Sequence, residues 1–155
     1  MKVKIRLAKE EDKEAIFALL KELASEIYKM PKKKAFELYD RLYNVTREYN
    51  KHIKRPSKSY RVYVLEVEGK IVGLASIIKG GRWLYIDDLV ISKEYRGRGY
   101  GKALVKYLEK VYRDCDYFEV DTHDGAVGFF KRLGFTEVFR FHEEITWIKM
   151  VKIVK

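Results

Sequence analysis

The chain has 155 residues, which is enough for one domain with a buried core. Its hydrophobic content of 47% excludes a chain that is disordered throughout. Cys115 is the single cysteine, so an intrachain disulfide and a cysteine-based metal cluster are both excluded. No apolar run reaches the roughly 18 residues that a membrane span needs. We therefore expect one domain over residues 1–155 that is soluble, cytoplasmic and not attached to a membrane.

The formal net charge is +10, and the charged residues are spread along the whole chain. The sequence has no Gln and two Asn, whereas Lys and Glu abound, a pattern typical of heat-adapted (thermophilic) proteins. A basic chain suits a polyanionic ligand. Nucleic acid is the weaker interpretation, because the sequence contains no groove-reading motif.

The first third of the chain predicts one strand and two helices. Residues 3–7 alternate apolar and charged side chains, which favours a strand with one buried face. An apolar stripe at helical spacing then covers residues 16–27, up to Pro31. A second stripe covers residues 38–53 and predicts one further helix before Pro56.

The rest of the chain predicts mostly antiparallel sheet. The expected strands lie around Val62 and Val64 and at residues 71–78, 83–91, 117–120, 135–141 and 145–151, and the expected helices follow Gly101 and cover residues 124–133. The strands on either side of the helix after Gly101 are joined by a crossover, so they should run parallel. The predicted fold class is α/β (α+β), with a mixed, mostly antiparallel, twisted sheet of about six to seven strands and helices on both faces.

A glycine-rich turn joins the strand at residues 83–91 to the helix that follows it. Gly97, Gly99 and Gly101 lack a Cβ, so the backbone can adopt left-handed angles and approach a ligand closely. The first turn of the helix offers N–H donors and the positive end of the helix dipole. The basic residues around the turn are Arg96, Arg98 and Lys102. Together these features predict a pyrophosphate site.

Other phosphate-binding motifs fit the turn less well. Lys102 is followed by Ala103 and not by Ser or Thr, which excludes a P-loop. The spacing Gly-x-Gly-x-Gly differs from the Gly-x-Gly-x-x-Gly of dinucleotide-binding folds. A glycine-rich helix cap without a ligand is the remaining alternative.

Two segments of the chain match motifs of one protein family. Residues 89–101, Leu-Val-Ile-Ser-Lys-Glu-Tyr-Arg-Gly-Arg-Gly-Tyr-Gly, resemble the central motif of the GNAT superfamily of acetyl-CoA-dependent N-acetyltransferases, an apolar strand end followed by Arg/Gln-x-x-Gly-x-Gly/Ala. Residues 126–135, Ala-Val-Gly-Phe-Phe-Lys-Arg-Leu-Gly-Phe, resemble its C-terminal helix, Ala-x-x-Phe-Tyr-x-x-Leu-Gly-Phe. The motifs occur in the family's order, and the resemblance spans nearly the whole chain.

The resemblance implies a GNAT-like fold with acetyl-CoA as co-substrate. In that family the end of the strand binds the pantetheine arm, and a backbone N–H near Leu89 or Val90 faces the thioester oxygen. Backbone amides from Arg98 to Ala103 would hold the pyrophosphate. The coenzyme-binding residues that the resemblance implies are Leu89, Val90, Ile91, Arg96, Gly97, Arg98, Gly99, Tyr100, Gly101, Lys102, Ala103, Phe129 and Phe130.

Transfer to an amine also needs a proton acceptor, because an amine is protonated at neutral pH. The candidate bases are Asp87, Asp88 and Glu119, on the strands beside the expected thioester site. Neighbouring strand residues point to opposite faces, so at most one of Asp87 and Asp88 should face a given pocket. Glu119 and Asp87 are the first candidates.

One position departs from the family pattern. Phe130 stands where the family usually has a tyrosine that protonates the leaving thiolate. Phenylalanine cannot donate a proton, so His123 is a candidate substitute, with Tyr85 and Tyr100 as weaker ones. A coenzyme-A-binding module that has lost catalysis is therefore the alternative function.

The leading function is acetyl transfer to a primary amine by direct attack in a ternary complex. The acceptor stays open among amine-bearing small molecules, peptides and proteins. The aromatic residues of the first helices, with Trp147, suit a partly apolar or a cation-binding pocket, and core packing accounts for most of them. The three histidines show no metal-ligand spacing, so we expect no metal site. A homodimer is compatible with the sequence.

Overall fold

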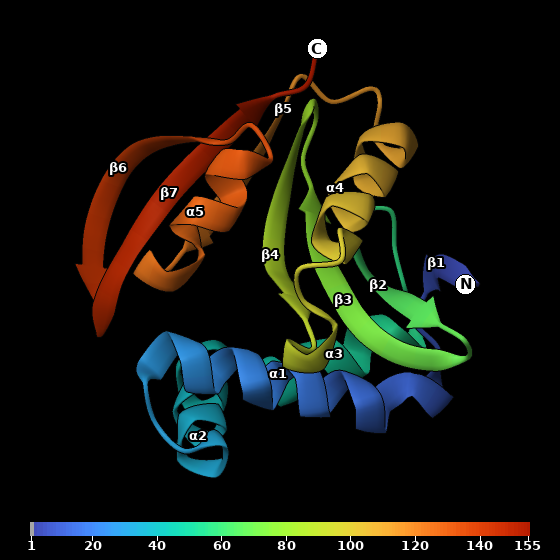
Figure 1. The fold of residues 1–155 in the computed structure, drawn as a ribbon, viewed down its shortest axis with the longest axis vertical. Helices are drawn as coiled ribbons and strands as arrows, with labels where there is room; N and C mark the ends of the chain where they lie inside the picture. The colour runs from blue at the N-terminus through green and yellow to red at the C-terminus, as the bar shows by residue number, and fades with distance from the viewer. Residues whose placement is uncertain (1) are drawn as a thin grey trace.

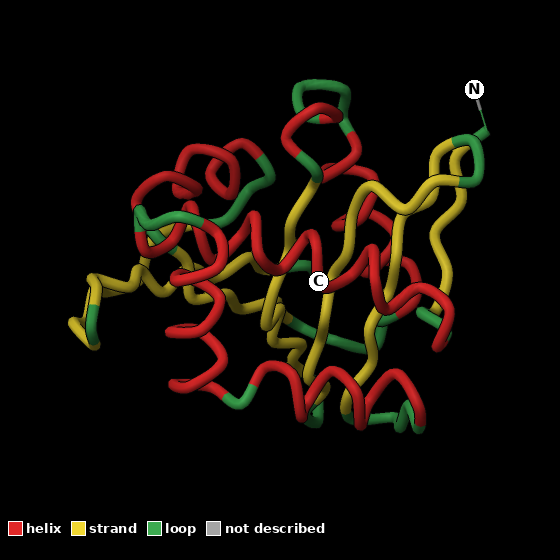
Figure 2. Tube along the Cα trace, turned by 90° about the horizontal axis from the view of Figure 1, so that it is seen from below, coloured by secondary structure: helices red, strands yellow, loops and turns green. Residues whose placement is uncertain are grey.

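The computed structural model describes residues 2–155, which form one seven-stranded sheet with helices on both faces (Figures 1 and 2). The strands are β1 (Val3–Leu7), β2 (Tyr60–Val67), β3 (Lys70–Lys79), β4 (Trp83–Ile91), β5 (Tyr117–Thr122), β6 (Thr136–Glu143) and β7 (Ile145–Ile153). The α-helices are α1 (Lys13–Tyr28), α2 (Lys32–Tyr43), α3 (Val45–Lys54), α4 (Tyr100–Val111) and α5 (Asp124–Arg132). Within this range no helix combines the length and the apolar character that crossing a membrane requires.

The sheet has the strand order β1-β2-β3-β4-β5-β7-β6. All neighbours pair antiparallel except β4 and β5, which run parallel and are joined through α4. This arrangement confirms the predicted mixed, mostly antiparallel sheet and its single parallel pair. The pairing of β4 with β5 ends at Ile86 and Val120, so the two strands separate beyond that point.

Two hydrophobic cores lie on opposite faces of the sheet. Successive residues of β2 point to opposite faces, so Val62 and Val64 pack with α1 whereas Tyr63 and Leu65 pack with α4. The helical stripe predicted at residues 16–27 is the buried face of α1. Each face of the sheet is therefore covered by helices. The sheet is interrupted where β4 and β5 separate, and the candidate site lies there.

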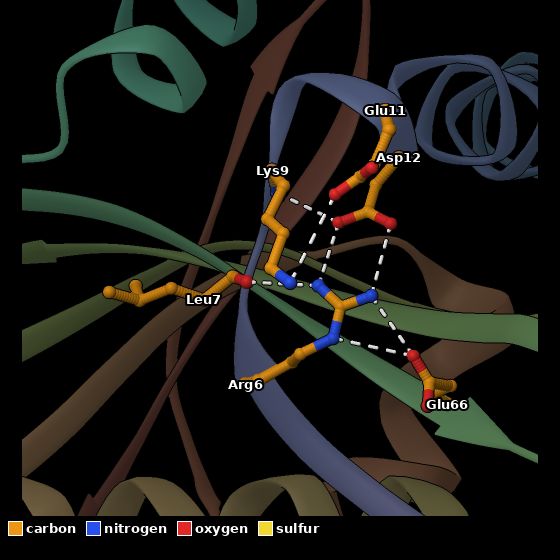
Figure 3. Close-up of polar contacts among 6 residues, drawn as sticks. All are labelled: Arg6, Leu7, Lys9, Glu11, Asp12 and Glu66. Atoms are coloured by element: carbon orange, nitrogen blue, oxygen red, sulfur yellow. Dashed lines mark hydrogen bonds and ion pairs between the residues drawn. The ribbon is translucent and has the colours of Figure 1, made fainter. Parts of the chain in front are cut away.

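The N-terminus of α1 is held to the sheet by a partly buried ion-pair cluster (Figure 3). Arg6 on β1 donates from Nη1 to Asp12 Oδ2 at 2.8 Å and from Nη2 to Glu66 Oε1 at 3.0 Å. The backbone N–H of Lys9 donates to Asp12 Oδ2 at 2.7 Å. The Arg6 hydrogen bonds lower the pKa of Asp12 below its ordinary value. This cluster fixes the position at which α1 starts.

The single helix expected at residues 38–53 is wrong, because the structure has two helices there. α2 ends at Tyr43 and α3 begins at Val45, with Asn44 between them in the left-handed conformation at φ 53°. Asn tolerates this conformation better than most residues. The break is also stabilised by Asp40, whose carboxylate accepts a hydrogen bond from the N–H of Thr46 at 2.8 Å. The apolar spacing continued across Asn44 and so concealed the change of direction.

A second irregularity lies in β4. Ser76 of β3 pairs with Asp88, whereas the next residue, Ile77, pairs with Ile86. Asp87 is therefore an extra residue on β4, which is a β-bulge. A bulge bends the strand locally and redirects its side chains, here directly before the part of β4 that separates from β5.

Candidate active site

A cavity of about 350 Å³ lies where β4 and β5 separate. Every helix except α4 contributes to its wall, together with the ends of the central strands and of the β6–β7 hairpin. Its carboxylates are Glu48, Asp87, Asp88, Asp121 and Glu143, and its aromatic residues are Tyr39, Tyr43, Tyr49, Tyr60, Tyr85, Phe129, Phe130, Phe141 and Trp147. No lysine or arginine lines it. The cavity is thus acidic and aromatic in a chain whose net charge is +10.

Asp88 is buried at the end of the cavity and accepts hydrogen bonds from three hydroxyl groups. Tyr39 of α2 donates to Oδ1 and Tyr49 of α3 donates to Oδ2, with Ser76 of β3 at 3.5 Å. Burial raises the pKa of Asp88, and these hydrogen bonds act in the opposite direction. The carboxylate therefore joins both helices to the bulged strand.

Asp87 lies beside it and has fewer partners. The hydroxyl of Tyr60 donates to Asp87 Oδ2 at 3.1 Å. Within residues 2–155 no lysine or arginine forms an ion pair with Asp87 or Asp88. Burial, followed by the neighbouring charge of Asp88, raises the pKa of Asp87 to about 7.

The expectation that at most one of these two acids faces a given pocket is wrong, since both line the same cavity. The expectation assumed regular alternation along the strand. The bulge at Asp87 interrupts that alternation, so consecutive carboxylates converge instead of pointing apart.

Glu119, the other first candidate for the base, is not among the residues that line the cavity. Its Oε2 accepts a hydrogen bond from Lys149 Nζ at 2.7 Å. Asp121, two residues further along β5, does line the cavity and lies 3.1 Å from the same Lys149 Nζ. Its Oδ2 also accepts a hydrogen bond from Tyr85 at 2.8 Å. Asp121 was missed because the strand was expected to end at Val120, whereas β5 continues to Thr122.

His123 precedes the first residue of α5 and lines the cavity wall. Burial lowers its pKa, so the imidazole is mainly neutral at pH 7. It therefore adds a hydrogen-bonding group and no full positive charge. The part of the chain that the structure describes has no cluster of three or more His, Cys, Asp or Glu arranged to hold a metal ion.

The glycine-rich turn lies at the start of α4. Gly97 and Gly99 have φ angles of 77° and 85°, which other residues rarely adopt. A Cβ at Gly101 would lie 2.5 Å from the ring of Phe129, so only glycine lets α5 pack this closely on the first turn of α4. The N–H of Ala103 donates to the carbonyl of Gly99 at 3.0 Å, so it is already used within the helix. The first-turn donors at Gly101 and Lys102 have no intrahelical acceptor.

The three basic residues of the turn have different surroundings. Arg96 is held by Glu26, to which it donates at 2.5 and 2.7 Å, and by the carbonyl of Ile91 at 2.8 Å. It therefore anchors the turn to α1 and β4. Arg98 and Lys102 are exposed beside the helix start and can meet an anion there. Arg96 was expected beside the pyrophosphate, but in this geometry its hydrogen bonds give it a structural role. Arg98 and Lys102 remain accessible to an anion.

The backbone of β4 at Leu89, Val90 and Ile91 pairs with β3 on one side. Its pairing with β5 has ended before this point, so the opposite edge is open toward the cavity. Leu89 lines the cavity. Phe130 also lines it, with its ring between those of Phe129 and Phe135 at centroid distances of 5.0 and 5.3 Å. Leu89 and Phe130 thus place a strand end and an aromatic surface at the same cavity as the two aspartates.

Comparison with known proteins gives the family. Residues 17–155 match the acetyltransferase (GNAT) domain family, and the chain belongs to it. It is 35% identical over 92 residues to the glucosamine 6-phosphate N-acetyltransferase of Trypanosoma brucei brucei, covering 54% of this chain and 60% of that protein. It is 30% identical over 138 residues to an uncharacterised N-acetyltransferase of Methanocaldococcus jannaschii, covering 77% of this chain and 58% of that protein. The chain thus spans less than two thirds of the length of either relative.

The fold is shared with solved structures across its whole length. The crystal structure of PaiA N-acetyltransferase from Thermoplasma acidophilum in complex with coenzyme A superposes with a TM-score of 0.82. It is 17% identical in sequence, and the match covers 99% of both chains. The GNAT-like fold expected from the two motifs is thereby confirmed.

Proposed function

We propose that the chain transfers the acetyl group of acetyl-CoA to a primary amine bound in the acidic cavity. The observation that carries this proposal is the position of Asp87, which lines the cavity two residues before Leu89, where β4 is no longer paired with β5. Membership of the GNAT family supports the same activity. So does the fold shared with a protein that was crystallised with coenzyme A.

Acetyl-CoA would supply an activated acetyl thioester. The open edge of β4 at residues 89–91 would bind the extended pantetheine arm, and the first turn of α4 would hold the pyrophosphate. Arg98 and Lys102 would add positive charge beside it. Phe129 and Phe130 would pack against the sulfur end and exclude water from it.

The residues of the cavity then have distinct tasks. An aliphatic amine is almost fully protonated at neutral pH, so it must lose a proton before it can attack. Asp87, whose pKa is raised to about 7, is matched to accepting that proton. A backbone N–H near Leu89 can donate to the oxygen that gains negative charge during acyl transfer. Asp87 takes one proton from the ammonium, and the neutral amine then attacks the thioester carbon. The carbon–nitrogen bond forms, the carbon–sulfur bond breaks and coenzyme A leaves as thiolate, while the second proton on the nitrogen passes to that thiolate or to solvent.

Phe130 favours a second candidate function, a module that binds coenzyme A without catalysis. Its side chain is 3% exposed and packs between two phenylalanine rings, so no hydroxyl stands at that position. A thiol with a pKa of about 8.5 can leave as thiolate without a strong acid. Phe130 is therefore compatible with turnover, and acetyl transfer remains the first proposal.

Two measurements test the proposal in sequence. Acetyl-CoA should raise the melting temperature, because a ligand that binds only the folded state stabilises it. Thiol release from acetyl-CoA should then require both the protein and an amine acceptor. Stabilisation without thiol release across a broad panel of amines would support the binding module, and an absence of stabilisation would refute both candidates.

A further inference from the structure

The charge of the cavity is opposite to that of the chain. Among residues 2–155, five carboxylates and no lysine or arginine line it, although the chain carries a net charge of +10. His123 adds no full charge at neutral pH, because burial lowers its pKa. Lys149 pairs with Asp121 but is not itself a lining residue. Such a cavity attracts cations and repels phosphorylated molecules.

The carboxylates form two groups on different elements. Asp87 and Asp88 lie at the bulge of β4, and the charge of Glu48 on α3 acts on Asp87. Glu143 lies at the end of β6, and its charge acts on the hydroxyl of Tyr43. Asp121 acts on both Asp87 and Tyr43 and is itself paired with Lys149. Acids at the bulge of β4, on α3 and at the end of β6 suit a ligand with two or more positive charges.

An aromatic wall lies close to both groups. Tyr39, Tyr43 and Trp147 follow one another with ring-centroid distances of 5.6 and 6.4 Å. The hydroxyl of Tyr39 donates to Asp88, whereas the charge of Glu143 contributes to the raised pKa of Tyr43. Such rings pack well against methylene groups and attract cations to their faces. The wall therefore suits an aliphatic chain between two ammonium groups.

Glu48 and Glu143 have unused capacity for a cation. Glu48 approaches Arg47 and His52 only at 3.9 and 4.0 Å. For Glu143 the described residues provide no hydrogen-bond or ion-pair partner. Both side chains line the cavity, so a ligand there can approach them.

We propose, on the basis of the proposed acetyl transfer, that the acceptor is an aliphatic polyamine. Its reacting amino group lies at Asp87, its methylene chain lies along the wall of Tyr39, Tyr43 and Trp147, and its distal ammonium groups pair with Glu48 or Glu143. Phosphorylated amino sugars are excluded by the same charges. The acceptor named for the trypanosomal relative is therefore not the acceptor of this chain.

The test compares acceptors of different charge. Butylamine and 1,4-diaminobutane have the same four-carbon chain and differ by one amino group. Spermidine extends that chain by an aminopropyl group, and glucosamine 6-phosphate is an amino sugar with a negatively charged phosphate. Thiol release gives kcat/KM for each at low and high ionic strength. We expect 1,4-diaminobutane and spermidine to exceed butylamine at least tenfold at low ionic strength, with the advantage shrinking as salt screens the charges. Glucosamine 6-phosphate should show no turnover.

Variants locate the effect in the cavity. In the double variant Glu48→Gln/Glu143→Gln, the ratio of kcat/KM for spermidine to that for butylamine should fall about tenfold, mainly through KM. Glu143→Gln alone should reduce it about threefold, as expected for a partly exposed charge pair. Glu14→Gln makes the same charge change on the exposed face of α1 and should leave the ratio unchanged.

The outcomes separate this inference from the proposed function. Equal kcat/KM for butylamine and spermidine, or turnover of glucosamine 6-phosphate, would overturn the polyamine acceptor and leave acetyl transfer intact. A spermidine advantage that survives in the double variant would overturn the assignment of Glu48 and Glu143. If acetyl-CoA binds but none of these amines or a wider panel releases thiol, the proposed function fails and this inference fails with it.

Discussion

Replacing Asp87 with Asn removes the proposed proton acceptor with almost no change of shape. Asp87 is the cavity carboxylate that combines a raised pKa with a single hydrogen-bond partner, Tyr60. With a pKa of about 7, about a tenth of Asp87 is ionised at pH 6 and about nine tenths at pH 8. A positioned general base contributes about a hundredfold to ten-thousandfold to the rate. We expect Asp87→Asn to lower kcat/KM by at least a hundredfold at pH 8.

The pH profile identifies the group more sharply than the loss of rate. The productive complex needs an ionised Asp87 and an acceptor that enters as ammonium, so log kcat/KM should be bell-shaped. Its lower limb should bend at about 7, and its upper limb near the pKa of the amine at about 10. Because Asp87 and Asp88 interact, the lower limb reports the titration of the pair. In Asp87→Asn the bend at about 7 should disappear, and the remaining low rate should rise with the fraction of neutral amine up to about pH 10.

Stability gives a second readout that does not depend on turnover. The pKa of Asp87 is raised from 3.8 to about 7, so the stabilising effect of its neutral form is complete below about pH 4 and is lost as pH rises through about 7. The upper bound of that loss is about 4 kcal/mol, and water in the cavity reduces it. Asp87→Asn should therefore melt at a higher temperature than the parent protein at pH 8 but not at pH 4.

Glu119→Gln is the matched control. It makes the same charge change on β5, at a carboxylate that pairs with Lys149 outside the cavity lining. We expect its kcat/KM to stay within about threefold of the parent value, in line with the small contribution of a partly exposed ion pair. Full activity in Asp87→Asn together with loss of activity in Glu119→Gln would refute the assignment and make Glu119 the base.

Three further predictions concern the coenzyme site, the leaving group and the start of α1. Gly101→Val should weaken coenzyme A binding at least tenfold by calorimetry, or about 1.4 kcal/mol, because its Cβ would meet the ring of Phe129 at 2.5 Å; unchanged affinity in a folded variant contradicts this. Phe130→Tyr should raise kcat most at low pH, where protonation of the leaving thiolate matters most; a pH-independent kcat ratio of one would show that departure does not limit the rate. Asp12→Asn should cost about 2 kcal/mol of unfolding free energy at pH 7 by breaking the partly buried pair with Arg6, a value between those of exposed and buried pairs. Because the pKa of Asp12 is lowered in the folded state, this difference in unfolding free energy is present above about pH 4 and is lost as pH falls through the lowered pKa. Denaturant titrations of both proteins at pH 7 and at a series of pH values below about 4 check this.

Most of the sheet could be predicted because its signals are local. Turn residues at Glu68-Gly69 and Gly80-Gly81 separate apolar runs of strand length, and β4 has the bounds expected from them. The parallel pairing of β4 with β5 follows from the helix between them. Composition, turn chemistry and periodicity agree over this part of the chain, so the fold class was accessible from the sequence.

The acidic cavity was not accessible in the same way. Its carboxylates come from α3, β4, β5 and β6, which tertiary packing brings together. Glu143 lies in a polar hairpin segment, and Asp121 lies just past the expected end of its strand. Nothing in the spacing of these residues marks them as neighbours. The sequence indicated a partly apolar or cation-binding aromatic region and the acids Asp87 and Asp88, but not Glu48, Asp121 and Glu143, which line the same cavity.

Two of the places where regular periodicity fails, Asn44 and the bulge at Asp87, shape the end of this cavity. Tyr39 and Tyr49 are ten residues apart, so on one straight helix they would be separated by about 15 Å along its axis. Both hydroxyls bond the single carboxylate of Asp88, which such a helix could not allow. The left-handed turn at Asn44 brings them together, and the bulge at Asp87 brings the second carboxylate to the same wall. A regular helix and a regular strand would have preserved the hydrophobic cores but would have left the acceptor end of the cavity without its paired acids.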